Sequence, residues 1–281
     1  MKVLIVTVAY NPTIEITNIL NIENFSHLVI DNSDIENSWL RNFCIERNYH
    51  YLPLGGNKGI AEALNKGAEF AIKLGCDYII TMDQDSKLTK YILQQMINFI
   101  NGYVDTTKVA IFSPRHINPS DKYIKHSEEY SNDIFTMTSG NFLNLKIWES
   151  LKGFNSKLFI DLVDFDYNAR AILAGFKVLT INTIEMHQYV GENATTKWIG
   201  KYGFDVWHHG KIRKYYQARN YNYIYKQYKN QLPEAKLLKK IIRKMPISII
   251  FFEKNKLSKL LYYFLGVVDY YRGKLGKFNW W

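Results

Sequence analysis

The sequence predicts an α/β protein with a doubly wound sheet flanked by helices and a basic helical region at its C-terminus. The first 85 residues hold four short apolar runs separated by helix-like segments, which is the pattern of such a sheet. A hydrophobic content of 47% is ample for a packed core and excludes a globally disordered chain. Charge is uneven, because residues 211–281 hold 17 Lys/Arg and 3 Asp/Glu, whereas residues 1–210 hold 19 and 23. We therefore predict two regions, 1–210 and 211–281.

β-Branched runs mark the predicted strands of the first half. The run 3–8 is typical of a central parallel strand, and Pro12 prevents its simple continuation. The helix over 60–74 has its apolar residues on one face and ends at Gly75. The other strands are expected at 27–30, 49–54 and 78–82, and the other helices at 14–20 and 36–47.

The second half is predicted in the same way, with glycines ending its helices. A strand, a tight turn and a second strand are expected over 136–143. The other expected strands are 109–112 and 176–181, and the expected helices are 91–102, 146–151 and a longer one that opens within 159–166 and ends at 174.

Two carboxylates follow the predicted strand over 78–82. Asp83 and Asp85 stand one residue apart, and alternate residues of an extended segment point the same way, so both can bind one hard cation. In α/β proteins, ligands bind at the carboxyl ends of strands. A cation held by two carboxylates keeps positions for phosphate oxygens and water, which suits Mg2+ or Mn2+ at a nucleotide site. A solvated turn is the alternative interpretation, and a second Asp-x-Asp occurs at 164–166.

Two common classes of nucleotide-binding protein are excluded. A dinucleotide-binding fold needs G-x-G-x-x-G after its first strand, where this sequence has Ala9-Tyr10-Asn11-Pro12. No G-x-x-x-x-G-K-[ST] occurs in the chain, which excludes a P-loop. Phosphate would therefore be bound through a metal ion.

Short motifs with further polar residues occur in a set order along the chain. They are Thr7-Val8-Ala9-Tyr10-Asn11, Asp31-Asn32-Ser33, Asn57 to Gly67, Asp83-Gln84-Asp85, Ser139-Gly140, Val163 to Arg170, His187 to Gly191, and Tyr215 to Asn220. In these motifs, over about residues 1–225, the sequence resembles inverting glycosyltransferases of family 2, and most of all bacterial rhamnosyltransferases. The resemblance implies the GT-A fold, a mixed sheet flanked by helices, followed here by the basic helical extension.

The resemblance also implies a binding site for a nucleotide sugar. Its residues would be Thr7, Tyr10, Asn11, Asp31, Asn57, Gly59, Asp83, Gln84 and Asp85. Of these, Asp31 matches a position that contacts the base, and Asp83 and Asp85 match the Asp-x-Asp that meets the metal and the diphosphate. His187 matches a histidine that often ligates the metal or touches the diphosphate.

The catalytic base is the other element that the resemblance implies. Asp164 matches the aspartate of the usual Glu-Asp pair, but Val163 stands where the family often has Glu, and Asp161 is the alternative base. A helix N-cap is the structural alternative for Asp164. Further contacts to acceptor or donor are expected from Asp161, Asp166, Gly140 and Arg219.

The expected reaction is transfer of a sugar from a nucleotide diphosphate to a hydroxyl group. A divalent ion stabilises the departing diphosphate, and one base without a protein nucleophile gives single displacement with inversion. By resemblance the donor is dTDP-rhamnose, with UDP-hexose or UDP-galactofuranose as alternatives. The acceptor is a saccharide, often lipid-linked, in bacterial surface polysaccharide such as capsule. The competing hypotheses are an enzyme that makes nucleotide sugars and a non-catalytic sugar- or membrane-binding protein on a degenerate transferase fold.

The basic C-terminal region predicts contact with an anionic surface. Cationic residues alternate with apolar and tyrosine-rich clusters from Lys211 to Lys277, as in helices that lie on membranes. A helical subdomain packed on the core is the alternative. No nucleic-acid-binding motif accompanies the region, so nucleic acid is not an expected partner. The sequence leaves the oligomeric state open.

The expected location is cytoplasmic, at the inner face of the plasma membrane. Cys44 and Cys76 follow no metal or redox spacing, which favours free thiols in a reducing compartment. The N-terminal apolar run lacks a small-residue cleavage site and is interpreted as the first strand.

Overall fold

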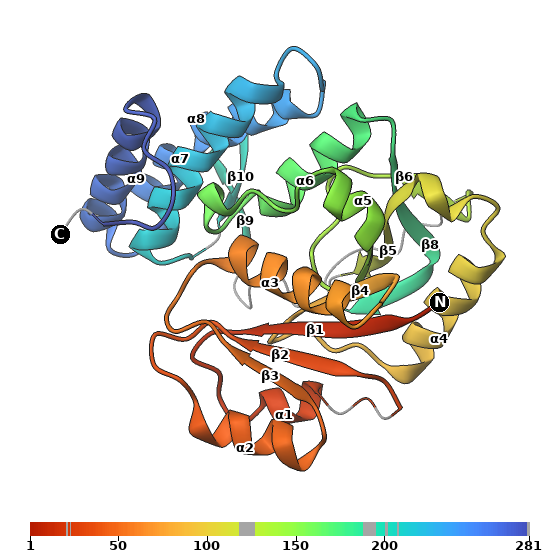
Figure 1. The fold of residues 1–281 in the computed structure, drawn as a ribbon. Helices are drawn as coiled ribbons and strands as arrows, with labels where there is room; N and C mark the ends of the chain where they lie inside the picture. Colours follow the sequence, from red (N-terminus) through yellow and green to blue (C-terminus); the bar gives the residue numbers. More distant parts are fainter. Residues whose placement is uncertain are drawn as a thin grey trace. The chain divides into compact units, whose positions relative to one another are not determined.

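A computed structural model describes residues 1–279 except 21, 23, 118–126, 188–194, 200, 201 and 207 (Figure 1). The chain divides into two compact units. The sheet unit comprises Met1–Ser156 and Val163–Gln188, and the helical unit comprises Lys157–Leu162 and Tyr189–Trp281. The short segment 157–162 thus interrupts the sheet unit in sequence but makes its contacts with the helical unit.

Eight strands of the described residues form one mixed sheet in the order β3-β2-β1-β4-β7-β5-β8-β6. They are β1 (Val3–Ala9), β2 (His27–Asp31), β3 (His50–Pro53), β4 (Tyr78–Asp83), β5 (Val109–Ile117), β6 (Tyr130–Asn132), β7 (Asn141–Asn144) and β8 (Lys177–His187). The first four are parallel neighbours, as predicted, whereas β7 is antiparallel to β4 and β5. The α/β class with a mixed sheet is confirmed.

Helices of the sheet unit cover the sheet through small and apolar residues. They are α1 (Ile16–Ile19), α2 (Ser38–Glu46), α3 (Ile60–Lys73), α4 (Lys90–Gly102), α5 (Leu145–Ser150) and α6 (Val163–Leu173), with a 3-10 turn at Thr106–Lys108. A second 3-10 turn, Ser156–Leu158, begins at the last residue before segment 157–162. Helix α3 lies along β1 (Figure 1). A Cβ at its Gly67 would stand 2.6 Å from Cγ1 of Val6, so glycine permits the close approach of helix and strand.

The described part of the helical unit contains two antiparallel strands and three helices, besides segment 157–162. The strands are β9 (Thr195–Ile199) and β10 (Tyr202–Val206), and the helices are α7 (Lys211–Tyr228), α8 (Ala235–Phe252) and α9 (Lys256–Tyr271). Helix α7 packs against both α8 and α9 and buries Tyr215, Arg219 and Asn220. None of the described helices is long and apolar enough to cross a membrane.

The structure corrects several predicted boundaries. Residues 136–138 form no strand, because the Thr138 carbonyl accepts a hydrogen bond from the Thr81 hydroxyl instead of joining a ladder. Strand β8 continues six residues past the predicted end at Ile181 and includes His187. Clustered by contacts, the two units divide between residues 188 and 189, and segment 157–162 belongs to the second unit. The division into regions 1–210 and 211–281 stays a prediction from the sequence.

Candidate active site

The carboxyl ends of β1, β2 and β4 meet at one edge of the sheet. Ala9 pairs with Asp31 and Val8 pairs with Asp83, so the loops that follow these strands begin side by side. Gln84 Oε1 accepts a hydrogen bond from the Tyr10 amide at 2.7 Å, which ties the loop after β4 to the loop after β1. The Asn11 amide donates to Ser33 Oγ at 2.8 Å and ties the β1 loop to the β2 loop. The structure thus brings together the residues predicted to bind the nucleoside, and Thr7 lies buried in β1 beneath them.

Asp31 organises the loop after β2. Its carboxylate accepts hydrogen bonds from the Ser33 amide (3.0 Å), the Asn37 amide (2.9 Å) and the Tyr51 hydroxyl (2.6 Å). Burial of Asp31 opposes its charge, but these hydrogen bonds outweigh burial and lower the pKa of the carboxyl. Asp31 is therefore an anion whose oxygens already hold this loop in shape.

The loop before α3 is fixed to the β2 loop. Asn32 Oδ1 accepts from the Lys58 amide at 2.8 Å, and Asn57 Oδ1 accepts from the Gly59 amide at 3.0 Å. Gly59 has φ of +88°, a conformation that side chains with a Cβ rarely adopt. The predicted turn chemistry of Asn57 and Gly59 thus places the start of α3 at the same edge as Asp31.

The end of β4 at Asp83 is held by the turn Ser139-Gly140. The Asp83 amide donates to Ser139 Oγ at 3.0 Å, and the Gly140 amide donates to the Thr81 carbonyl at 2.7 Å. Asp83 is half-buried and Asp85 is exposed. Gly140 has φ of +79°, and a Cβ there would lie 2.7 Å from Met186 Sδ, so this glycine is needed for packing as well as for the turn.

His116 also belongs to this arrangement, and sequence reasoning missed it. Its Nε2 lies 2.6 Å from the carbonyl oxygen of Ser139, the residue whose Oγ accepts from the Asp83 amide. Burial lowers the pKa of His116, so the ring is neutral near pH 7 and donates this hydrogen bond. Predicted strand 109–112 stops short of His116 because Pro114 interrupts the apolar run.

His187 is the last residue of β8, where it is exposed and pairs with Ile117 next to His116. The rest of its motif, Gln188 to Gly191, lies outside the described residues. Within the described ranges, no three His, Cys, Asp or Glu side chains form a ready metal cluster. The oxygens of Asp83 and Asp85 nevertheless fit Mg2+ or Mn2+, because such ions are commonly held by one or two carboxylates and completed by phosphate oxygens and water.

Asp164 shares a small cavity with residues of β4 and β7. It is the second residue of α6, rather than its N-cap, and it is half-buried. With Thr81, Thr138 and Asn141 it lines a small cavity, and Thr81 precedes Asp83 by two residues in β4. The predicted base and the predicted metal ligands are thus placed around the same strand.

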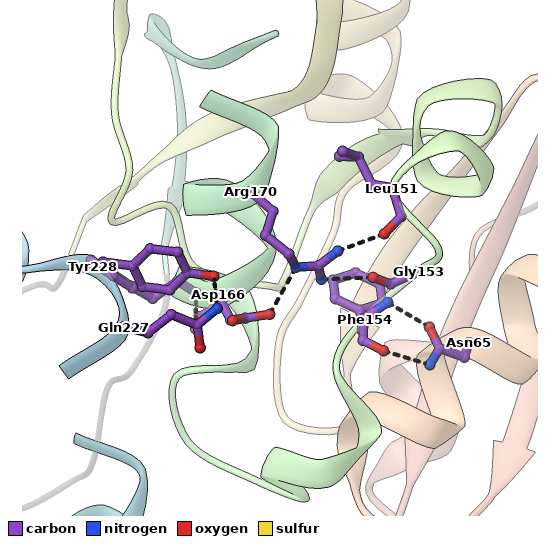
Figure 2. Close-up of polar contacts among 10 residues, drawn as sticks. Asn65, Leu151, Gly153, Phe154, Asp166, Arg170, Gln227 and Tyr228 are labelled. Carbon is purple, nitrogen blue, oxygen red and sulfur yellow. Dashed lines mark hydrogen bonds and ion pairs between the residues drawn. The ribbon is translucent and has the colours of Figure 1, made fainter. Parts of the chain in front are cut away.

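Asp166 has a structural partner. Its carboxylate is buried and lies 3.0 Å from Nε of Arg170, one helical turn later. Figure 2 shows that the same guanidinium also donates to the carbonyls of Leu151 and Gly153, both at 2.7 Å. The pair therefore anchors the loop between α5 and the 3-10 turn.

Asn65 of α3 holds the next residues of that loop. Its side-chain amide accepts from the Phe154 amide at 2.8 Å and donates to the Phe154 carbonyl at 2.9 Å (Figure 2). The motif residues Asn65 and Arg170 thus position backbone in the sheet unit.

Two predicted contact residues belong to the helical unit. The carboxylate of Asp161 is nearly buried and pairs with Arg213 at 3.1 Å, and burial raises its pKa although Arg213 opposes this. Arg219 is fully buried and donates to backbone carbonyls at Leu158 and Gly276. Both side chains are engaged within the helical unit.

The sequence matches the model of the family described as glycosyl transferase family 2 over residues 13–162, more than half of the chain. The chain belongs to glycosyl transferase family 2. The matched residues include the loops after β2 and β4 and the turn at Gly140, and they end just before Asp164.

A curated relative supports the family assignment over almost the whole chain. The dTDP-rhamnosyl transferase RfbF of Shigella flexneri is 26% identical over 295 aligned positions, which cover 96% of each protein. The protein is a glycosyltransferase.

Solved structures of two other proteins share the fold. A mannosyltransferase from Pyrobaculum calidifontis, solved with GDP-Man and Mn2+, has a TM-score of 0.61 and 12% identity and covers 97% of this chain and 88% of its own. TarS of S. aureus (residues 1–349), solved with UDP-GlcNAc, has a TM-score of 0.58 and 13% identity, covering 98% and 82%. This glycosyltransferase therefore has the GT-A fold.

Proposed function

We propose that the protein transfers rhamnose from dTDP-rhamnose to a saccharide acceptor with inversion at the anomeric carbon. The observation that carries this proposal is the similarity to a dTDP-rhamnosyl transferase along 96% of both chains. The edge formed by β1, β2 and β4 supports it, because nucleoside and diphosphate ligands bind at the carboxyl ends of strands in α/β folds.

In this proposal the donor lies across the edge of the sheet. Tyr10, Asn11 and the loop of Asp31 hold the nucleoside, and Asn57, Gly59 and Gln84 complete the nucleotide side. Asp83 and Asp85, with His187, would hold Mg2+ or Mn2+, which neutralises charge on the departing diphosphate. The chain's own contribution is to fix the backbone of Asp83 through Ser139, whose carbonyl accepts a hydrogen bond from His116.

Asp164 acts as the base. Its carboxylate takes the proton from the acceptor hydroxyl as that oxygen attacks the anomeric carbon, and the bond from this carbon to the diphosphate oxygen breaks. The nucleoside diphosphate leaves with the bonding electrons, so one displacement inverts the configuration. The first turn of α6 favours the carboxylate, because a helix N-terminus carries partial positive charge.

A thermal-shift panel tests the donor. We expect dTDP-rhamnose with Mn2+ to raise the Tm of the protein more than UDP-glucose, UDP-galactofuranose or GDP-mannose, because bound donor stabilises only the folded state. The same panel without Mn2+ should give smaller shifts for every donor. A larger shift with a UDP-hexose would replace rhamnose in the proposal, and equal shifts with and without Mn2+ would argue against metal-assisted donor binding.

We further propose that the helical unit docks on the anionic inner surface of the plasma membrane, where a lipid-linked acceptor would be presented. Helix α9 exposes five apolar side chains, Leu257, Leu261, Phe264, Val268 and Tyr271. Their spacing of four and three residues puts them on one face of the helix. Leu257 and Tyr271 are more than three-quarters exposed. Contiguous apolar surface of this kind is typical of sites that bind a protein or a membrane.

The charge of this surface favours anionic lipid. Between residues 235 and 279 the two carboxylates, Glu253 and Asp269, are buried, and Glu253 pairs with Lys214 and Lys259. The exposed charges there are all positive: Lys236, Lys239, Lys240, Arg243, Lys244, Lys254, Lys256, Arg272, Lys274 and Lys277. An apolar stripe flanked by cations matches helices that lie in the membrane interface.

Sedimentation with vesicles tests this surface. We expect binding to vesicles that contain phosphatidylglycerol, loss of binding in high salt, and at least ~10-fold weaker binding for Lys239→Glu/Lys240→Glu, because each cation contributes about 1 kcal/mol. The control Lys73→Glu/Lys177→Glu makes the same charge change on exposed lysines of the sheet unit. Equal weakening by both pairs would show that net charge alone matters, and failure to bind at low salt would overturn the proposal.

A further inference from the structure

The segment 157–162, here called the strap, has an unusual backbone. Phe159, Asp161 and Leu162 have φ of +69°, +63° and +62°, although none of them is glycine. The left-handed region is unfavourable for residues with a Cβ, especially for bulky ones, and it persists only where the surroundings impose it. Leu162 is bonded to Val163, the first residue of α6, so the strap ends two residues before Asp164.

Two buried side chains of helix α7 donate hydrogen bonds to the backbone of the strap. Asn220 Nδ2 lies within hydrogen-bond distance of three strap carbonyls: Leu158 (2.9 Å), Ile160 (2.6 Å) and Asp161 (3.2 Å). Arg219 Nη2 donates to the Leu158 carbonyl at 3.0 Å. Both side chains are fully buried, so neither is available to solvent.

Arg219 also links the strap to the C-terminal end of the described chain. Its Nη1 donates to the Gly276 carbonyl at 2.7 Å, and the Gly276 amide donates to the Lys157 carbonyl at 2.7 Å. The guanidinium lies over the rings of Tyr215 and Tyr216, with centroids at 5.3 and 5.1 Å. The guanidinium is thus bound by backbone carbonyls and aromatic rings of the helical unit.

The strap side chains are fixed to the same helix. The ring of Phe159 stacks on Tyr216 with centroids 5.1 Å apart and planes inclined by 11°. Asp161 forms the ion pair with Arg213. Helix α7 thus contacts both the backbone carbonyls and the side chains of the strap.

We propose that Arg219 and Asn220 are positioning residues for the transfer reaction. They hold the strap in its left-handed conformation, and the strap sets the entry of the chain into α6 and hence the position of Asp164. This inference rests on the proposed role of Asp164 as the base. In this proposal the motif Tyr215 to Asn220 positions the base and contacts neither donor nor acceptor.

Kinetics of Asn220→Ala against Asn222→Ala test the proposal. Asn222 lies on the same helix, and its side-chain amide donates to the Ala218 carbonyl of that helix. We expect Asn220→Ala to lower kcat by about 100-fold, because a small misplacement of a catalytic group can cost that much. Its donor affinity should match wild type, because the predicted donor residues belong to the sheet unit. Asn222→Ala should keep both kcat and donor affinity.

A second variant separates positioning from loss of folding. Leu162→Gly in the Asn220→Ala background accepts positive φ without strain, so it should restore part of the lost kcat. An equal loss of kcat in Asn220→Ala and Asn222→Ala would overturn the proposal. A fall in kcat that only follows the fraction of folded protein, measured by circular dichroism, would do the same.

Hydrogen exchange tests the strap without any donor. In Asn220→Ala the amides of 158–166 should exchange faster than in wild type, whereas Asn222→Ala should leave them unchanged. If wild type fails to turn over dTDP-rhamnose while Asn220→Ala still exchanges these amides faster, the proposed donor is wrong. The proposal that Asn220 positions the strap is then supported. Unchanged exchange at 163–166 would overturn the device whatever the donor.

Discussion

Asp164→Asn should reduce kcat by about 10²–10⁴-fold, the usual contribution of a general base. Asparagine has the same shape but cannot take a proton from the acceptor hydroxyl. Asp164 is half-buried and lines a cavity with Thr81, so the substitution should leave the fold and the donor site intact. We expect donor affinity, measured by calorimetry with Mn2+, to equal that of wild type.

Asp161→Asn is the control for this assignment. Asp161 pairs with Arg213 in the helical unit, so its substitution should lower stability more than it lowers kcat. If Asp164→Asn retains turnover while Asp161→Asn abolishes it, Asp161 is the base. If both folded variants lose turnover completely, the two carboxylates are both required, and the mechanism with a single base is contradicted.

Asp85→Ala should abolish both turnover and the Tm increase that Mn2+ gives with donor. Asp85 is exposed in the turn that follows β4, so removal of its carboxylate costs little folding free energy. Without it the metal loses an oxygen ligand, and the metal's stabilisation of the leaving diphosphate, worth several kcal/mol, is lost. We expect a fall in kcat/KM of at least ~10³-fold by the same reasoning.

Glu46→Ala is the matched control, because it removes an exposed carboxylate at the end of α2. It should change neither the metal-dependent Tm increase nor the rate. If Mn2+ with donor still raises the Tm of Asp85→Ala, Asp85 is not a metal ligand. Of the two aspartates, Asp83 alone would then be assigned to the metal.

The parallel half of the sheet could be predicted because burial on both faces leaves a strong sequence signal. The apolar runs of β1, β2 and β4 end within about a residue or two of their predicted positions, the usual uncertainty of element ends. Strand β6 was missed because Tyr130–Asn132 is short, polar and at the edge of the sheet. Hydrogen bonds of an edge strand need no apolar pattern, so nothing in these residues indicates one.

The part of the site that lies at the ends of strands could be predicted from the sequence. Asp31 and Asp83 follow recognisable strands, so their proximity follows from the order of a doubly wound sheet. The role of Ser139 and His116 could not be predicted, because their contacts are to backbone groups brought in by the antiparallel strand β7 and by β5. The strap was missed for the same reason: its partners Arg219 and Asn220 are about sixty residues away, and carbonyl acceptors carry no sequence signature.

Anomalous scattering at the manganese edge, from crystals grown with Mn2+ and the donor dTDP-rhamnose, tests the central claim most directly. We expect one manganese peak within ligand distance of Asp83 or Asp85, and the anomeric carbon of the bound sugar on the side of Asp164. A manganese ion or a sugar bound elsewhere on the chain, away from the carboxyl ends of β1, β2 and β4, would contradict the claim.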